Sequence, residues 1–348
     1  MPISIVVGGQ YGSEGKGKIA HWLANRQNAK YAVRVGGPNS GHTAISDDKT
    51  YALRQLPTPS LLGNVVSVIS SGAYLDVDVL LDEIKTLKIE VGQLLIHPHA
   101  VLIDEWMREE EVERNLTGRI SSTGQGVGAA VAYRALRDSR VRFAKDHKAL
   151  SKYIAPNLSE LIASGLHNGE RVVVEGTQGF GLSILHGAHY PYATSRDTSA
   201  AGALSEAGLS PVDVDCVALV IRSYPIRVAG NSGPLLNETS WESVTRTSGS
   251  SEPLFEKTTV TGNTRRIAEF DSSVVKAAIA GNNPTHICLN HADYFDFSVH
   301  EKSMTSQSVS NQINEIEAAI DRPIDWVGTG PSTTFDKATS ERLRVSAA

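Results

Sequence analysis

The sequence predicts an α/β fold in which helices flank a largely parallel central sheet. Short runs rich in β-branched residues recur along the chain, and several are apolar at nearly every position. Such runs are expected of strands that are covered on both faces. Stretches with helical spacing of apolar residues separate them. This alternation is typical of a parallel sheet with crossover helices.

The predicted elements can be placed by residue number. The predicted strands cover residues 4–7, 32–35, 65–69, 93–96, 172–174, 217–221 and 286–289. The predicted helices cover residues 17–25, 78–87, 105–115, 157–163 and 310–319. Segments 118–128, 230–234 and 247–253 are rich in Gly, Ser, Thr and Pro and are expected to be loops. With no repeat or linker, residues 1–348 are expected to form a single domain with small subdomain elaborations.

Composition excludes several classes of protein. A formal net charge of -5 provides no overall basic field, so no nucleic-acid partner is expected. The sequence has neither a signal peptide at its amino terminus nor an apolar run of the roughly 18 residues that a membrane span needs. We therefore expect no membrane partner and a cytoplasmic location, the host cytoplasm if the protein is phage-encoded. Cys216 and Cys288 lie far apart and are expected to be buried, reduced thiols.

The strongest motif follows the first predicted strand. Its core is Gly12-Ser13-Glu14-Gly15-Lys16-Gly17-Lys18, which fits the P-loop pattern G-x-x-x-x-G-K. Glycines let backbone N–H groups converge on a phosphate, and the following helix adds a partial positive charge. Lys16 and Lys18 are candidate partners of a β- or γ-phosphate, although Ile19 stands where a standard P-loop has a Ser or Thr for magnesium. A turn made only for packing is the alternative.

A second glycine-rich block follows the next predicted strand. It reads Gly36-Gly37-Pro38-Asn39-Ser40-Gly41-His42-Thr43. A histidine in a flexible loop of this kind can approach a ligand closely and act as an acid or base near neutral pH. His42 is therefore a candidate catalytic residue, with a purely structural histidine as the alternative.

Together these two blocks resemble adenylosuccinate synthetase, whose usual wording is G-x-Q-W-G-D-E-G-K-G-K followed by G-G-x-N-A-G-H-T. The resemblance continues in order through residues 122–128, 175–179, 190–195, 227–234, 261–266, 290–293 and 329–331. It implies a ligase that first moves the γ-phosphate of a nucleoside triphosphate onto O6 of a purine nucleotide. The amino group of L-aspartate then displaces that phosphate. The resemblance also implies Mg2+ as cofactor and a homodimer.

The resemblance assigns roles to individual residues. The implied catalytic residues are Ser13, Lys16 and His42, and the implied magnesium ligands are Ser13 and the Gly41 carbonyl. The implied triphosphate-binding residues are Gly12, Glu14, Gly15, Lys16, Gly17, Lys18, Gly41, His42, Thr43, Asn290, Asp293, Gly330 and Pro331. The implied purine monophosphate-binding residues are Ser13, Asn39, Ser122, Thr123, Arg137, Gln178 and Thr194, with Arg137 reaching across a dimer interface. The implied aspartate-binding residues are Thr261, Gly262, Asn263, Thr264 and Arg265.

Ser13 departs from the family pattern, which has an aspartate there as base on purine N1 and as magnesium ligand. A hydroxyl with its usual pKa replaces a carboxylate in neither role at neutral pH. One reading is a catalytically inert purine-nucleotide sensor. The sharper reading is a changed substrate, because Lys16, Lys18 and His42 remain. Serine is smaller than aspartate and leaves room for a 2-amino group beside N1, which predicts a guanine base.

Asn263 is the second departure, since it stands where T-G-R-x-R has its first arginine, near aspartate and the ribose hydroxyls. Its neutral side chain fits a deoxyribose. With a chain shorter than typical members, these changes resemble a phage branch that joins dGMP to aspartate on the route to 2-aminoadenine (base Z). An ordinary synthetase acting on IMP is the alternative, and a P-loop kinase or NTPase is a weaker one.

Residues 290–293 bear on the identity of the triphosphate donor, because they resemble the base-binding motif N-K-x-D. In that motif the aspartate reads the N1–H and 2-amino groups of guanine, and His291 replaces the lysine that packs over the base. The phage branch is associated with ATP or dATP. We therefore predict an adenine donor, while Asp293 keeps GTP as the alternative. The aspartate could also simply cap the segment that follows.

Overall fold

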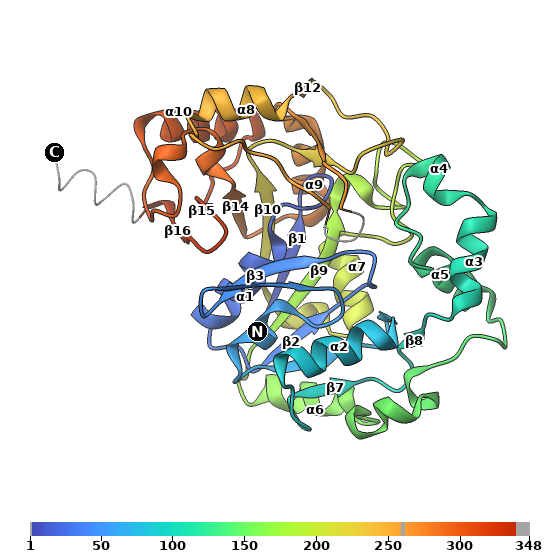
Figure 1. The fold of residues 1–348 in the computed structure, drawn as a ribbon. Coiled ribbons are helices and arrows are strands. Elements are labelled where there is room, and N and C mark those ends of the chain that lie inside the picture. The colour runs from blue at the N-terminus through green and yellow to red at the C-terminus, as the bar shows by residue number, and fades with distance from the viewer. Residues whose placement is uncertain (1, 259–261, 339–348) are drawn as a thin grey trace.

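The computed structural model describes residues 2–258 and 262–338. Within these residues the main sheet has nine strands, in the order β16-β15-β14-β10-β1-β9-β2-β5-β7 (Figure 1). In that order the strands are Thr334–Asp336, Trp326–Gly328, His286–Asn290, Val214–Arg222, Ile3–Gly8, Val172–Gly179, Tyr31–Arg34, Val66–Ile69 and Leu94–Ile96. Neighbours pair in parallel except β15 and β16, which are antiparallel. The predicted fold class is confirmed.

Each predicted strand overlaps an observed strand, and each predicted helix overlaps an observed helix. The five helices concerned are α1 (Lys16–Arg26), α2 (Val77–Leu87), α3 (Glu105–Glu113), α6 (Leu158–His167) and α10 (Gln307–Ile320). Strand β1 is buried at all six positions, as expected of a strand at the centre of a covered sheet. Its side chains alternate: Val6 packs with Ile19 and Leu23 of α1, whereas Ile5 and Val7 belong to the core on the opposite face.

Other elements surround this sheet. The further strands are β3 (His42–Ser46), β4 (Lys49–Leu53), β6 (Tyr74–Leu75), β8 (Val101–Leu102), β11 (Ile226–Arg227), β12 (Glu238–Thr239) and β13 (Arg266–Ala268). The further α-helices are α4 (Leu116–Ile120), α5 (Val127–Leu136), α7 (Ala200–Ala207), α8 (Trp241–Ser248) and α9 (Ser272–Asn282). Short 3-10 helices are η1 (Thr58–Leu62), η2 (Ala144–Asp146), η3 (Lys148–Tyr153), η4 (Phe180–Leu182), η5 (Pro211–Asp213), η6 (Ala292–Tyr294) and η7 (Phe297–Val299). Figure 1 shows α3, α4 and α5 grouped at one side, away from the nine-stranded sheet.

Two loop predictions were wrong in part. Segment 118–128 contains most of α4 and the start of α5, and 247–253 contains the end of α8. The glycines of segment 118–128 led to the prediction of a loop, but side chains outside the segment stabilise the first turns of α4 and α5. The Asn115 side chain accepts from Gly118 N at 3.3 Å, and the Glu111 carboxylate accepts from Gly126 N and Gly128 N at 2.9 and 2.8 Å. Segment 230–234 is a loop, as predicted.

The loop prediction for His42 was also wrong. His42 is the first residue of β3, which pairs antiparallel with β4 in a hairpin, and its side chain is only 7% exposed. The pairing of His42 with Leu53 fixes the backbone of His42, so the imidazole is buried at a defined position. Cys216 and Cys288 are buried and unpaired, as predicted. In the part of the chain that the structure describes, no helix combines the length and the apolar character needed to cross a membrane.

Candidate active site

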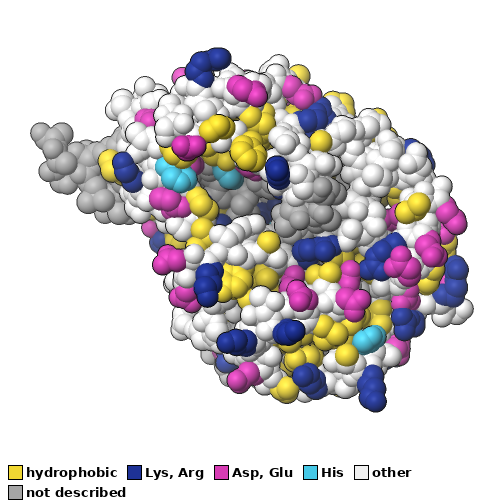
Figure 2. Space-filling view, in the orientation of Figure 1, with side chains coloured by type: hydrophobic (Ala, Val, Ile, Leu, Met, Phe, Trp, Pro, Cys, Tyr) yellow, Lys and Arg dark blue, Asp and Glu magenta, His cyan; other side chains and the backbone are white. Residues whose placement is uncertain are grey.

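A cavity of about 670 Å³ lies where the central parallel strands end at their carboxyl termini. Its walls come from the segments that follow β1, β2, β9, β14 and β15, together with residues of the 111–128 region, the residues around β11, residues 256–258 and Arg265. Figure 2 shows a hollow near the middle of the view. In open α/β sheets this edge is the usual place for a ligand.

The loop between β1 and α1 is organised from within by Glu14. Its fully buried carboxylate accepts from Gln10 N and Gly12 N at 3.1 and 2.8 Å, and from the Lys16 ammonium at 2.6 Å. Gly12 and Gly15 have positive φ, at 91° and 88°, which favours glycine. Lys16 lines the cavity, but Glu14 is not among the lining residues. Glu14 therefore shapes the loop and holds Lys16, whereas the cavity is faced by the glycines and Lys16.

Lys18 and Asn290 connect this loop to the other end of the sheet. The Lys18 ammonium donates to the carbonyls of Gly330 and Thr333 at 2.8 and 3.1 Å. The Asn290 amide donates to Glu14 O at 2.7 Å. Burial lowers the pKa of Lys18. Lys18 still lines the cavity, so a phosphate there would compete with two carbonyls for its protons.

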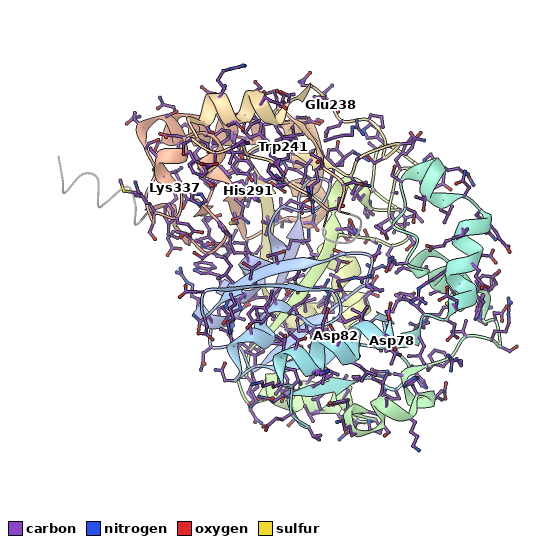
Figure 3. The ribbon with its side chains drawn as sticks, viewed as in Figure 1. Asp78, Asp82, Glu238, Trp241, His291 and Lys337 are labelled. Atoms are coloured by element: carbon purple, nitrogen blue, oxygen red, sulfur yellow. The ribbon has the colours of Figure 1, made fainter. Side chains whose placement is uncertain are left out.

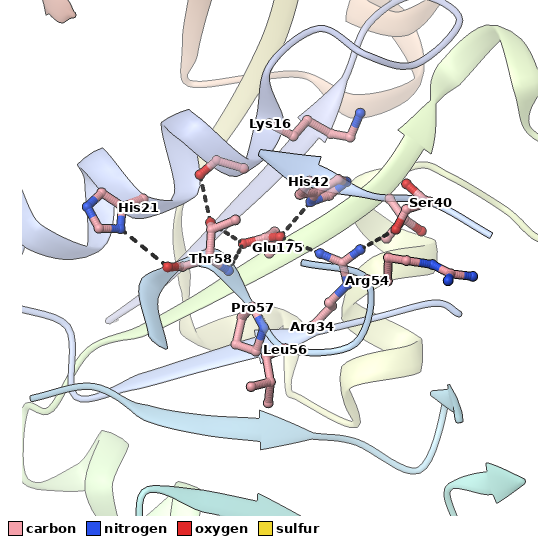
Figure 4. Close-up of polar contacts among 12 residues, drawn as sticks. Lys16, His21, Arg34, Ser40, His42, Arg54, Leu56, Pro57, Thr58 and Glu175 are labelled. Carbon is pink, nitrogen blue, oxygen red and sulfur yellow. Dashed lines mark hydrogen bonds and ion pairs between the residues drawn. The ribbon is translucent and has the colours of Figure 1, made fainter. Parts of the chain in front are cut away.

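His42 forms a buried pair with Glu175 in the middle of β9 (Figure 4). Its Nδ1 lies 2.5 Å from Glu175 Oε1, and its Nε2 is buried with no hydrogen-bond partner among the described residues. The same carboxylate accepts from Arg34 Nη1 at 2.8 Å and from the backbone N and hydroxyl of Thr58 at 2.8 and 2.6 Å. Glu175 thus fixes the imidazole through Nδ1 and leaves Nε2 available to a ligand.

Burial and the neighbouring Arg34 set the protonation states of His42 and Glu175. Burial, reinforced by the Arg34 guanidinium, lowers the pKa of His42 to about 4 although Glu175 opposes the shift. Burial alone would raise the pKa of Glu175, but His42 and Arg34 lower it to about 2. At neutral pH His42 is therefore neutral with its proton on Nδ1, and Nε2 is an acceptor.

Ser13 lies on the cavity wall and contacts an arginine of the proposed aspartate loop. Its Oγ accepts a hydrogen bond from Arg265 Nη1, and its carbonyl accepts from Arg222 Nη1 at 2.9 Å. Arg222 is fully buried and forms an ion pair with Glu256. Burial raises the pKa of Glu256 on its own, but Arg222 and other cations lower it to about 2. The pair Arg222–Glu256 therefore supports the backbone that presents Ser13.

The predicted monophosphate-binding residues largely come together. Asn39, Ser122, Thr123, Gln178 and Thr194 all line the cavity with Ser13. The Oδ1 of Asn39 is buried and has no hydrogen-bond partner among the described residues, as expected of a group awaiting a ligand. Arg137 is not on the wall: it is exposed at the carboxyl end of α5.

The predicted aspartate-binding residues are only partly brought together. Thr261 lies outside the described residues. Gly262, Asn263 and Thr264 are exposed and do not line the cavity, whereas Arg265 does. Lys257, which forms an isolated antiparallel bridge with Thr264, and Thr258 also contribute to the wall.

Most of the predicted triphosphate-binding residues also line the cavity, although Glu14, Asn290 and Asp293 do not. Gly12, Gly15, Lys16, Gly17, Lys18, Gly41, His42 and Thr43 line it, and His291, Gly330 and Pro331 close the end near β14 and β15. Figure 3 labels His291 in this part of the molecule. Burial lowers the pKa of His291 to about 3, so its ring is neutral. Asp293 is buried two residues after the lining residue His291 and does not itself line the cavity.

The match to known proteins agrees with this geometry. The sequence profile of the family described as "Adenylosuccinate synthetase" matches residues 5–152 and 141–302. A curated adenylosuccinate synthetase of Methanococcus maripaludis is 35% identical over 338 residues, covering 95% of this chain and 97% of the other. One from Thermococcus sibiricus is 37% identical, with 95% and 96% covered.

The chain belongs to the adenylosuccinate synthetase family. It is therefore a C–N ligase of purine nucleotide synthesis that uses a nucleoside triphosphate and aspartate. Because 97% of the Methanococcus chain is covered, the short length is shared with ordinary synthetases. Length is thus no mark of the phage branch.

Two solved structures share the fold. A fully ligated adenylosuccinate synthetase of Plasmodium falciparum has a TM-score of 0.83 at 22% identity, covering 97% of this chain and 99% of its own. The succinoaminodeoxyadenylate synthetase of cyanophage S-2L, bound to dGMP and dATP as an energy donor, has a TM-score of 0.83 at 27% identity. That alignment covers 99% of this chain and 97% of the phage chain.

Sequence reasoning assigned no role to three charged residues of this site, of which Glu175 and Arg222 are fully buried and Glu256 is partly buried. Glu175 and Arg222 each directly follow an apolar run, at 172–174 and 217–221, and a charge next to such a run was a usable signal. Glu256 lies in a polar segment, and nothing in the sequence marks its pairing with Arg222 across 34 residues.

Proposed function

We propose that this protein joins L-aspartate to C6 of dGMP, with ATP or dATP as phosphate donor. The product would be N6-succino-2-amino-2′-deoxyadenylate, a precursor of 2-aminoadenine in DNA. The observation that carries the proposal is Ser13 on the cavity wall, where the family pattern has an aspartate. A guanine 2-amino group beside N1 would lie close to that position, and a serine leaves it space.

The cyanophage structure supports this choice of substrates, since that protein is bound to dGMP and dATP. The curated relatives are ordinary adenylosuccinate synthetases, which supports the runner-up: IMP as acceptor and GTP as donor. The two readings differ in the fit of the base at Ser13. An inert sensor is the third reading, and the intact pair His42–Glu175 argues against it.

His42 would act on the reacting oxygen through Nε2. Glu175 holds Nδ1, so Nε2 is the nitrogen that faces a ligand. Substrate phosphates add negative charge near the ring, which raises the pKa of the imidazole and lets Nε2 carry a proton. The imidazolium would then donate to O6 as negative charge develops there, and Lys16 would stabilise the transferring phosphoryl group.

A magnesium ion fits this site only in part. Among the described residues there is no group of three His, Cys, Asp or Glu side chains that could hold a metal. The Ser13 hydroxyl accepts from the Arg265 guanidinium, so it is a poor ligand. Gly41 lines the cavity, and its carbonyl suits a hard cation. Mg2+ would thus be held mainly by triphosphate oxygens with Gly41, and would neutralise their charge.

The exposed Arg137 supports a homodimer as part of the proposal. It lies off the cavity of its own chain, at the end of α5 beside the 72% exposed Leu136. In a homodimer it would reach the monophosphate of the partner subunit.

The test is an assay of dGMP, GMP, IMP and dIMP with aspartate and magnesium, each with ATP, dATP and GTP. Formation of the succinylated product is followed by chromatography. The proposal expects dGMP with an adenine donor to be the best pair. Equal or better use of IMP would establish the ordinary synthetase, and binding without turnover would establish the sensor.

A further inference from the structure

Asp293 and His300 form a contact beside the proposed donor end of the cavity. We propose that His300 selects the base of the triphosphate by occupying one oxygen of Asp293, which favours adenine over guanine. This inference rests on the proposed function, in which the end formed by His291 and Pro331 receives the donor base. His300 acts through Asp293, so it is a positioning residue.

The contact is short and well supported. His300 Nδ1 lies 2.6 Å from Asp293 Oδ2, and Phe297 stacks on the imidazole at 4.4 Å with an interplanar angle of 13°. Asp293 is 2% exposed, and its other oxygen, Oδ1, is buried with no hydrogen-bond partner among the described residues. A buried carboxylate oxygen without a donor is costly, so Oδ1 is a site that a ligand N–H would satisfy.

His300 is also tied to the loop that forms the cavity wall. The next residue, Glu301, donates its backbone N–H to Thr329 O at 2.7 Å. Its carboxylate accepts from Ser332 N and Oγ at 3.0 and 2.6 Å. The imidazole is thus held between Asp293 and the loop that carries Gly330 and Pro331. This arrangement keeps the imidazole on Oδ2 of Asp293.

The two purines differ in what they require of a carboxylate. Guanine presents two adjacent donors, N1–H and the 2-amino group, which match both oxygens of a carboxylate side by side. Adenine has an acceptor at N1 and a single donor group, the 6-amino group. Oδ2 already accepts from His300, which weakens it as an acceptor for a second donor, whereas Oδ1 has no donor among the described residues. The single donor group of adenine can be satisfied at Oδ1, whereas guanine needs both oxygens and meets the weakened Oδ2, so guanine gains less from its second N–H.

The experiment compares wild type with His300→Ala and His300→Asn. Asparagine keeps an N–H donor near the position of Nδ1, so it is the matched control. We measure kcat/KM for ATP and for GTP at saturating dGMP and aspartate. Wild type and His300→Asn are expected to prefer ATP. His300→Ala frees Oδ2 and should move the ratio of ATP to GTP efficiency at least tenfold toward GTP.

The Kd values of ATP and of GTP are also measured by calorimetry, with magnesium and without purine monophosphate, and their ratio is compared between wild type and the variants. If the binding ratio moves as expected while no succinylated product forms, the proposed function fails and the role of His300 stands. An unchanged ratio in His300→Ala, or a wild type that prefers GTP, overturns the inference, as does binding of neither triphosphate. If His300→Ala does not fold, His300→Leu replaces it, since leucine packs on Phe297 without a donor.

Discussion

The Arg265 guanidinium donates a hydrogen bond to the hydroxyl of Ser13, which joins the proposed aspartate loop to the P-loop. A neutral hydroxyl accepts this bond without forming an ion pair. An aspartate at the same place would hold Arg265 by charge and would occupy the space beside purine N1. The choice of residue at 13 therefore affects both the base and the arginine.

We predict that dGMP is converted faster than IMP and that Ser13→Asp reverses this order. The carboxylate would accept from N1–H of hypoxanthine and crowd the 2-amino group of guanine. Steady-state kcat/KM for both nucleotides measures the change. Ser13→Ala is the control, because it keeps the space and should keep the preference for dGMP. A wild type that uses IMP as well as dGMP would remove Ser13 from base selection.

His42→Ala should lower kcat by roughly 10²-fold or more, as expected when a positioned acid–base group is lost. Because His42 is buried and bonded to Glu175, the same change should also destabilise the fold, by about 1–3 kcal/mol. The rate is measured on protein shown by thermal melting to be folded at the assay temperature. His42→Gln is the control for folding, since its amide can donate to Glu175. A near-normal rate in either variant would exclude His42 from the chemistry.

The same pair predicts loss of stability in acid. In the unfolded chain the imidazole takes up a proton near pH 6.5, whereas in the folded protein the pKa of His42 is about 4. Between these values the unfolded state binds more protons, so stability falls as the pH falls, by about 3 kcal/mol in total. The lowered pKa of Glu175, about 2, acts in the same direction between roughly pH 4.5 and 2.

Thermal melts of wild type and His42→Gln from pH 7.5 to 4 measure this effect. Glutamine does not titrate, so the difference in Tm between the two proteins should shrink as the pH falls from 6.5 to 4. A constant difference would mean that His42 does not carry the linkage.

Much of the site was predictable because its residues follow strands. The apolar runs fix β1, β2 and β9, and parallel strands bring their carboxyl ends to one edge, where Ser13, Asn39 and Gln178 meet. The hairpin that buries His42 was not predictable, since its strands 42–46 and 49–53 lack a clear apolar alternation. The pair Arg222–Glu256 was also missed, because a contact between distant residues leaves no local pattern.

Glu256→Gln should destabilise the protein strongly, because it leaves the fully buried Arg222 without its counter-charge. Breaking a buried pair in this way costs about 3–5 kcal/mol. The free energy of unfolding is measured in urea. Glu238→Gln is the matched control: Glu238 pairs with Arg266 at the outer edge of the molecule (Figure 3), and its side chain is 44% exposed. That change should cost less than about 1 kcal/mol. Equal effects of the two substitutions would contradict a structural role for Arg222–Glu256.

The last prediction concerns the sugar and rests on Asn263. The backbone of Asn263 is fixed by Thr258, whose N donates to Asn263 O at 2.9 Å and whose hydroxyl accepts from Asn263 N at 3.1 Å. The side chain is exposed and stops short of the cavity wall, where the neighbouring Arg265 arrives. An arginine at 263 has the length to reach that wall and to bond a ribose hydroxyl, which the shorter amide does not.

We therefore expect dGMP to be preferred over GMP by roughly 10-fold, about 1.4 kcal/mol. The factor is modest, because failing to bond an extra hydroxyl rejects it less than an unpaired polar site would. Asn263→Arg should narrow the gap by improving GMP more than dGMP. Aspartate must be saturating in both assays, since the new arginine would also attract its carboxylates. If wild type uses both nucleotides equally and Asn263→Arg changes neither, residue 263 has no part in sugar choice, and selection of a deoxynucleotide would have to come from the cavity wall itself.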